Sequence, residues 1–148
     1  MTTVELSLAL LVLLLTPGPT NTLVMLAGAE RGFWPAMRLV PVELLAYLSA
    51  VLPFLWLGAA FPAQAAAARP VVAVLAGVWV LRLAWVMWQV PSVTSGARVV
   101  TAGRLFVTTL LNPKAVIMGV ALLPAATEET PRLAILSGLI VAIAAVWA

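Results

Sequence analysis

The chain has 148 residues, of which 64% are hydrophobic and 9% charged, and its mean hydropathy is +1.16. This balance excludes an ordinary water-soluble domain and indicates a membrane protein. The net charge of +3 comes from arginines scattered at the ends of apolar segments, so it reflects membrane topology and excludes a nucleic-acid partner. The chain contains no cysteine, histidine or aspartate, so we expect no disulfide, no metal site and no cofactor.

Long stretches without charge predict the spans. Residues 6–29 and 44–68 carry no charge, and each is longer than the ~20 residues that cross the hydrocarbon core as a helix. Because lipid cannot satisfy backbone polar groups, such runs predict helices rather than strands, and hence an all-α polytopic bundle. We expect one transmembrane domain over residues 1–148, with spans at about 4–29, 39–61, 70–90, 105–125 and 133–148.

The ends of the sequence carry two further expectations. Glu5 stands where a signal peptide would have its basic region, and no small-residue cleavage site closes the first apolar stretch, so this span is expected to stay in the protein. The last span, residues 133–148, is short of the ~20 residues needed to cross and has no polar tail. We therefore expect a truncated C-terminus.

The arginines of the connections predict an orientation. The first and third connections hold Arg31, Arg38, Arg98 and Arg104, whereas the second and fourth hold Arg69 and Arg132. The positive-inside rule then places the first and third connections in the cytoplasm and the N-terminus outside.

Two spans are interrupted by proline. The first contains "TPGPTN" and the fourth "LLNPKAV", three spans later, which predicts two inverted repeats of three spans around a midplane site. Proline cannot donate a helical hydrogen bond, so carbonyls four residues earlier need new partners. These are the carbonyls of Leu13, Leu15 and Thr109.

A zwitterion would suit such breaks. Freed carbonyls attract an ammonium group, and the amides of a restarted half-helix attract a carboxylate. Hydroxyl and amide side chains surround both breaks: Thr16, Thr20, Asn21 and Thr22 at the first, and Thr108, Thr109 and Asn112 at the second. The alternative is that the prolines only kink the spanning helices, and that Ser and Thr side chains bond the backbone groups freed at each kink.

Two charged residues within the predicted spans are candidates for the site, Lys114 and Glu43. A charge at the middle of a span costs about 2.5–3.5 kcal/mol on insertion scales, so we expect Lys114 to face the bundle interior, to hold a substrate carboxylate or to pair with Glu43. Snorkelling to an interface is the other reading of Lys114. Glu43, with Tyr47 one turn on, is the candidate proton-coupling group, and a solvated pair with Arg38 is its alternative.

The third span is rich in aromatic residues, and its pattern favours a structural role over a substrate-binding one. Arg82 lies between Trp79 and Trp85 at three-residue spacing, which permits cation–π contact. Trp85 and Trp88 are more typical of an interfacial belt, with Gln89 beside them, and Gly77 and Ala84 of close helix packing.

Four motifs resemble the lysine exporter and homoserine/threonine resistance (LysE/RhtB) family of amino-acid exporters. They are "LTPGPTN" at residues 15–21, "RG" at residues 31–32, "LAGVWVLRLAW" at residues 75–85 and "FVTTLLNPKAVIMGVALLP" at residues 106–124. The resemblance implies an inner-membrane secondary exporter of about six helices that moves amino acids or their derivatives outward with the proton gradient.

The chain departs from that family in two ways. Ala36, Val42 and Ala46 stand where the family repeats glycines, beside Pro35, Pro41 and Glu43. Family members are also longer, at roughly two hundred residues, so a truncated copy that does not transport is an open alternative.

The leading hypothesis is therefore an exporter of amino acids in which Lys114 and the amides after Pro19 hold the carboxylate. Freed carbonyls with Asn21 and Asn112 hold the amine, and Glu43 couples a proton. The substrate-binding residues are Pro17, Gly18, Pro19, Thr20, Asn21, Asn112, Pro113 and Lys114.

Three alternatives to the amino-acid exporter follow. A metal-ion exporter is disfavoured because one membrane glutamate supplies too few oxygen ligands. A non-transporting membrane fragment that packs with partner helices stays open. The oligomeric state, a homo-oligomer included, also stays open. No nucleophile with a base is recognisable, so an enzyme is not expected.

Overall fold

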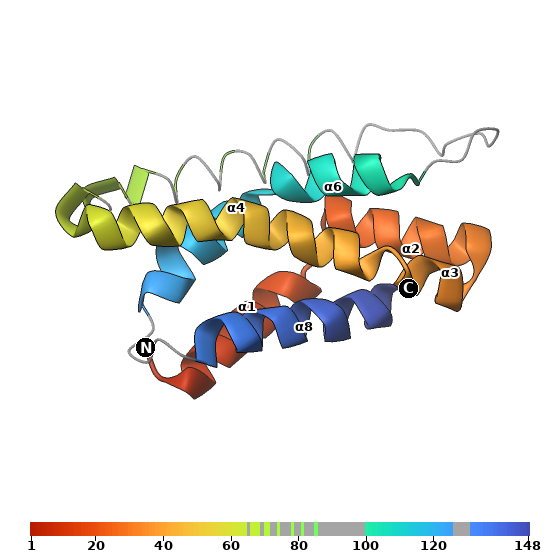
Figure 1. Ribbon diagram of the computed structural model, residues 1–148, viewed down its shortest axis with the longest axis horizontal. Coiled ribbons are helices and arrows are strands. Elements are labelled where there is room, and N and C mark those ends of the chain that lie inside the picture. The colour runs from red at the N-terminus through yellow and green to blue at the C-terminus, as the bar shows by residue number, and fades with distance from the viewer. Residues whose placement is uncertain are drawn as a thin grey trace.

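A computed structural model describes residues 1–64, 66–68, 70, 71, 74, 78, 81, 85, 100–125 and 131–148. Within these residues the secondary structure is helical and contains no strand, which confirms the all-α class for this part of the chain (Figure 1).

The first predicted span is two helices. α1 (Thr3–Leu15) begins at a capping box, in which the Thr2 hydroxyl accepts from the Glu5 amide and the Glu5 carboxylate accepts from the Thr2 amide. α2 (Pro19–Arg31) follows after a bend of 60°. Proline at the first position of α2 is favourable, because that position has no intrahelical N–H bond to lose.

The second predicted span contains the clearest membrane helix. α3 (Phe33–Met37) leads into α4 (Val40–Ala60), and the 28 residues Phe33–Ala60 are together long and apolar enough to cross a membrane. Gly32 joins α2 to α3 with φ of 82° and ψ of 169°, a conformation that side chains other than glycine's rarely allow.

The fourth predicted span is broken as well. α6 (Ala102–Leu110) and α7 (Pro113–Ile117) are bent by 44°, and α7 continues into a π-helical turn (Met118–Leu122) and a 3₁₀ turn (Leu123–Ala125). Such π-helical turns inside α-helices are frequent near functional sites.

α8 (Pro131–Trp147) completes the described bundle and is a shorter apolar helix of 17 residues. By length and composition, the described residues contain one membrane-spanning helix, or up to three if each bent pair is one span. The all-helical class is thus shown, and the five spans remain a prediction.

The helices run along a common long axis (Figure 1). α1 and α2 lead from the end of the bundle that holds the N-terminus to the opposite end, α4 and α6–α7 run back, and α8 returns beside α1. Side chains from these helices form the main core: Leu6, Leu10, Leu14, Tyr47, Val51, Ala115, Met118, Leu123, Leu136, Ile140 and Ile143.

Large apolar side chains also cover the outside. Val12 is 66% exposed, Trp56 69% and Trp85 69%, so large apolar side chains occupy outward-facing positions of the described helices. Trp79, Arg82, Trp88, Gln89, Gly77 and Ala84, the other residues singled out in span 70–90, lie outside the described residues.

Candidate functional site

The two proline breaks lie against each other in the core of the bundle. Side chains on both sides of the break in α6–α7 bond to backbone and side-chain atoms of the break in α1–α2, across 89 to 100 residues of sequence. The sequence predicted two polar breaks, and the fold brings them together at one place.

Lys114 bonds the two breaks directly. Its side chain is 6% exposed, and its ammonium group donates to the carbonyl oxygens of Leu14, at 3.2 Å, and of Thr16. Leu14 lies in the last turn of α1, where carbonyls lack intrahelical partners and the helix dipole favours a cation, and Thr16 is the C-cap residue that follows Leu15. Lys114 therefore faces the interior, and the snorkelling alternative is wrong.

Asn21 binds the same two carbonyls. Its Nδ2 donates to the Leu14 oxygen at 2.8 Å and to the Thr16 oxygen at 3.3 Å. Each carbonyl oxygen thus accepts from two donors, which matches its two lone pairs. We call the Leu14 carbonyl, the Thr16 carbonyl and the Asn21 amide the carbonyl cradle; Lys114 occupies it.

The carbonyls that accept from side-chain donors at the first break differ from those predicted. Leu13 and Leu15 were expected to be the acceptors at the first break, but the side-chain donors reach Leu14 and Thr16. Leu14 is buried on the inward face of α1, whereas Leu15 is 40% exposed and Thr16 is exposed as well. Pro113 has no N–H to offer the Thr109 carbonyl, which instead accepts from the Asn112 amide at 3.1 Å as α6 ends, so its new partner is the backbone rather than a ligand.

Thr20 is the polar centre between the breaks. Its Oγ1 accepts from Asn112 Nδ2 at 2.8 Å and from Thr109 Oγ1 at 3.2 Å, and all three residues are buried. The Asn112 Oδ1 in turn accepts from the Lys114 amide at 3.0 Å and so caps α7. Thr109 was named in the sequence only as a neighbour of the break, and the structure makes it a member of this network.

Glu43 and Tyr47 form the third side of the site. Both are buried, at 4% and 0% exposure, and among the described residues neither Glu43 Oε2 nor the Tyr47 hydroxyl has a hydrogen-bond partner. Thr20 lies near the Tyr47 hydroxyl. Arg38 is exposed and makes no ion pair with Glu43, so the solvated-pair alternative is wrong.

Lys114 is the cationic neighbour of Glu43. The two charges are near enough to interact electrostatically, but no ion pair within 4.0 Å joins them in the described part of the chain. The predicted Lys114–Glu43 pair is thus not formed here, because the ammonium group is held by the carbonyl cradle instead. A buried carboxylate without a partner is costly, so this oxygen is suited to bind a proton or a cation.

Gly18 makes room for the ammonium group. Its φ of −164° and ψ of 175° are extended, so any residue could adopt this backbone. A Cβ at this position, however, would lie 3.3 Å from Lys114 Cε and 3.5 Å from Nζ. A side chain at this position would thus be tight against Lys114, whose end would have to shift by a few tenths of an ångström.

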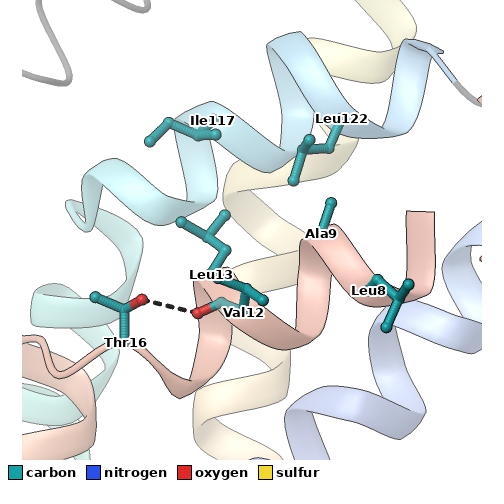
Figure 2. Close-up of a pocket in the computed structure, with 7 residues that line it drawn as sticks. All are labelled: Leu8, Ala9, Val12, Leu13, Thr16, Ile117 and Leu122. Carbon is teal, nitrogen blue, oxygen red and sulfur yellow. Dashed lines mark hydrogen bonds between the residues drawn. The ribbon is translucent and has the colours of Figure 1, made fainter. Parts of the chain in front are cut away.

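A groove of about 470 Å³ reaches the edge of the carbonyl cradle (Figure 2). It lies between α1 and the α7 segment, and Thr16 is the polar residue among those that line it. The Thr16 hydroxyl donates to the Val12 carbonyl at 2.7 Å, back toward its own helix. The lining residues are Leu8, Ala9, Val12, Leu13, Thr16, Ile117 and Leu122.

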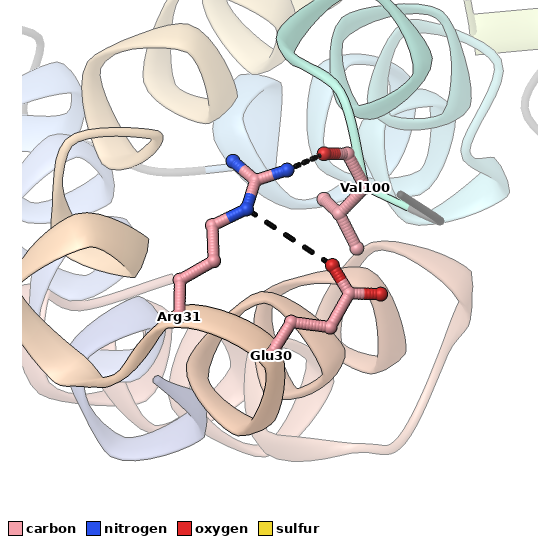
Figure 3. Close-up of polar contacts among 3 residues, drawn as sticks. All are labelled: Glu30, Arg31 and Val100. Atoms are coloured by element: carbon pink, nitrogen blue, oxygen red, sulfur yellow. Dashed lines mark hydrogen bonds and ion pairs between the residues drawn. The ribbon is translucent and has the colours of Figure 1, made fainter. Parts of the chain in front are cut away.

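One end of the bundle is basic. Arg31 bonds the Val100 carbonyl just before α6, and its Nε lies 4.0 Å from a carboxylate oxygen of Glu30 (Figure 3). Arg38 and Arg104 lie at the same end, which we call the arginine end. Three of the four arginines on which the orientation prediction depends thus lie at one end of the bundle, and Arg98 lies outside the described residues.

Comparisons with protein-family models, with curated proteins and with solved structures find no match to this chain.

Proposed function

We propose that this chain is a secondary membrane transporter that exports amino acids or their derivatives, with the substrate bound where the two broken helices meet. The observation that carries the proposal is the buried Lys114 ammonium group held by the Leu14 and Thr16 carbonyls. A broken helix that binds an ammonium group in the core of a membrane bundle has the chemistry that the amino end of a zwitterion requires.

The carboxyl end of a zwitterion also has candidate partners. α2 begins at Gly18, which has no side chain to cap the helix, and its first turn presents a positive dipole end to the same place. The Lys114 ammonium group lies beside it and has three N–H donors, two of which serve the carbonyl cradle. Glu43 is the proposed proton-coupling residue, because its Oε2 is buried without a partner beside Lys114.

The resemblance to the LysE/RhtB family supports the same proposal. Its two most specific motifs, "LTPGPTN" and "NPKA", are the segments whose side chains meet in the site. We extend the proposal to a multi-pass protein of the inner membrane with the inverted-repeat fold of that family. The arginine end would be cytoplasmic and the N-terminus outside.

Efflux from intact cells tests the proposal. Cells that express the chain are loaded with labelled apolar, hydroxylated and basic amino acids, and the loss of label is compared among the native chain and two variants inserted at equal levels. Replacing Pro17 and Pro19 by alanine restores two N–H donors to the break, and we expect export to be lost. Pro53→Ala is the matched control, since Pro53 lies inside α4 at an exposed position away from both breaks, and export should persist.

Two outcomes would count against the proposal. Equal export by the native chain and the Pro17/Pro19 variant would separate transport from the broken helix. Absence of export of every amino acid, despite full insertion of the native chain, would favour the non-transporting fragment.

A further inference from the structure

The carbonyl cradle is an ammonium site whose present occupant is attached to the protein. The carbonyls of Leu14 and Thr16 at the C-terminal end of α1 accept from Lys114, and no carboxylate of the described residues takes part in the contact. A free primary ammonium group presents the same three donors as the end of a lysine side chain. The site would therefore accept the amino group of a ligand wherever Lys114 leaves it.

We propose that the carbonyl cradle is a primary-ammonium subsite that Lys114 occupies in the unliganded chain, and that a ligand's ammonium group displaces Lys114 to bind. One consequence for transport rests on the proposed function: a transported substrate would bind this subsite only by displacing Lys114. Binding of an ammonium ligand does not depend on transport.

The acceptors of the subsite select primary ammonium groups. The Leu14 and Thr16 oxygens both accept from the Lys114 ammonium group, so an occupant that replaces it must supply at least two N–H donors. A quaternary ammonium has no N–H donor for either oxygen. The carbonyl cradle should thus bind alkylammonium ions and reject tetramethylammonium.

Glu43 gives the displaced side chain a destination. It is the carboxylate whose charge acts on Lys114, and its Oε2 is buried without a hydrogen-bond partner in the described residues. The exchange then leaves no buried cation unpaired: the ligand takes the carbonyls, and Lys114 turns to Glu43 or to the carboxylate of a zwitterion.

Thermal unfolding of the purified chain in detergent tests the subsite with n-propylammonium. Lys114→Ala removes Cγ, Cδ, Cε and Nζ, the atoms that n-propylammonium contains. We expect the Tm of this variant to rise with the logarithm of n-propylammonium concentration above its Kd, and not with tetramethylammonium at equal ionic strength. Lys114→Met is the matched control, since its side chain fills the space without a donor, and its Tm should respond to neither ion. A Lys114→Ala variant that ignores n-propylammonium would overturn the proposal.

A measurement on the native chain covers the case in which Lys114→Ala does not fold. Lys114 is the only lysine in the sequence, so lysine labelled with ¹⁵N at Nζ gives one side-chain resonance. Displacement predicts that n-propylammonium shifts this resonance saturably and that tetramethylammonium does not. An unchanged resonance at every n-propylammonium concentration would refute displacement. A saturable shift in a chain that exports no amino acid would uphold the subsite and refute the proposed function.

Discussion

Thr20→Val is the most direct test of how the two breaks are joined. Valine has nearly the shape of threonine but cannot accept the bonds from Asn112 Nδ2 and Thr109 Oγ1, at 2.8 and 3.2 Å. The Thr109 hydroxyl can turn to a carbonyl of its own helix, whereas the Asn112 amide stays buried without this acceptor. A buried donor left unpaired costs about 1–3 kcal/mol, and hydrogen bonds inside membrane bundles average nearer 0.6 kcal/mol. We therefore expect a loss of about 1–2 kcal/mol.

Thermal unfolding in detergent measures this loss. For a chain of this size, about 1 kcal/mol corresponds to roughly 2–4 °C in Tm, so Thr20→Val should lower Tm by about 2–8 °C. Thr20→Ser keeps the acceptor and should recover most of the stability. Thr108→Val is a matched control, because Thr108 is half-buried beside the network and takes no part in it. Thr20→Val unfolding at the same temperature as Thr108→Val would refute the assignment of Thr20 as the polar centre.

Two further predictions concern the backbone and the orientation. Gly32→Ala should destabilise the chain by about 1–3 kcal/mol, because a φ of 82° strains the alanine backbone although the added Cβ meets no atom within 4 Å. Gly103→Ala is the control: a Cβ there also meets no atom within 4 Å, but the residue is helical, so the change should be neutral or stabilising. Equal Tm values for the two variants would refute the strain at Gly32. Because the chain has no cysteine, Ala63→Cys and Ala102→Cys can each be labelled alone. A membrane-impermeant maleimide should reach Ala63→Cys in intact cells and Ala102→Cys only after lysis, and the reverse pattern would invert the proposed orientation.

Local chemistry accounts for what the sequence could predict. The Pro-Gly-Pro cluster and the Asn-Pro pair are recognisable in the sequence and predict the breaks before Pro19 and Pro113, whereas Pro53 lies inside α4 without ending it. The helical class and the burial of a mid-span Lys114 also follow from the sequence. Glu43 and Tyr47 fall one turn apart on a helix, and both are buried. These features depend on residues close together in sequence.

Tertiary structure decided which groups meet. Nothing in the sequence indicates that the Lys114 ammonium group bonds the Leu14 and Thr16 carbonyls. Those residues are 100 and 98 positions away, and every residue has a backbone carbonyl, so the sequence does not mark which ones act as acceptors. The expected partners, a substrate carboxylate or Glu43, were chosen because charge is visible in a sequence. The direction of the backbone at the end of α1 is visible only once that helix is packed, and it provides the acceptors that hold Lys114 away from Glu43.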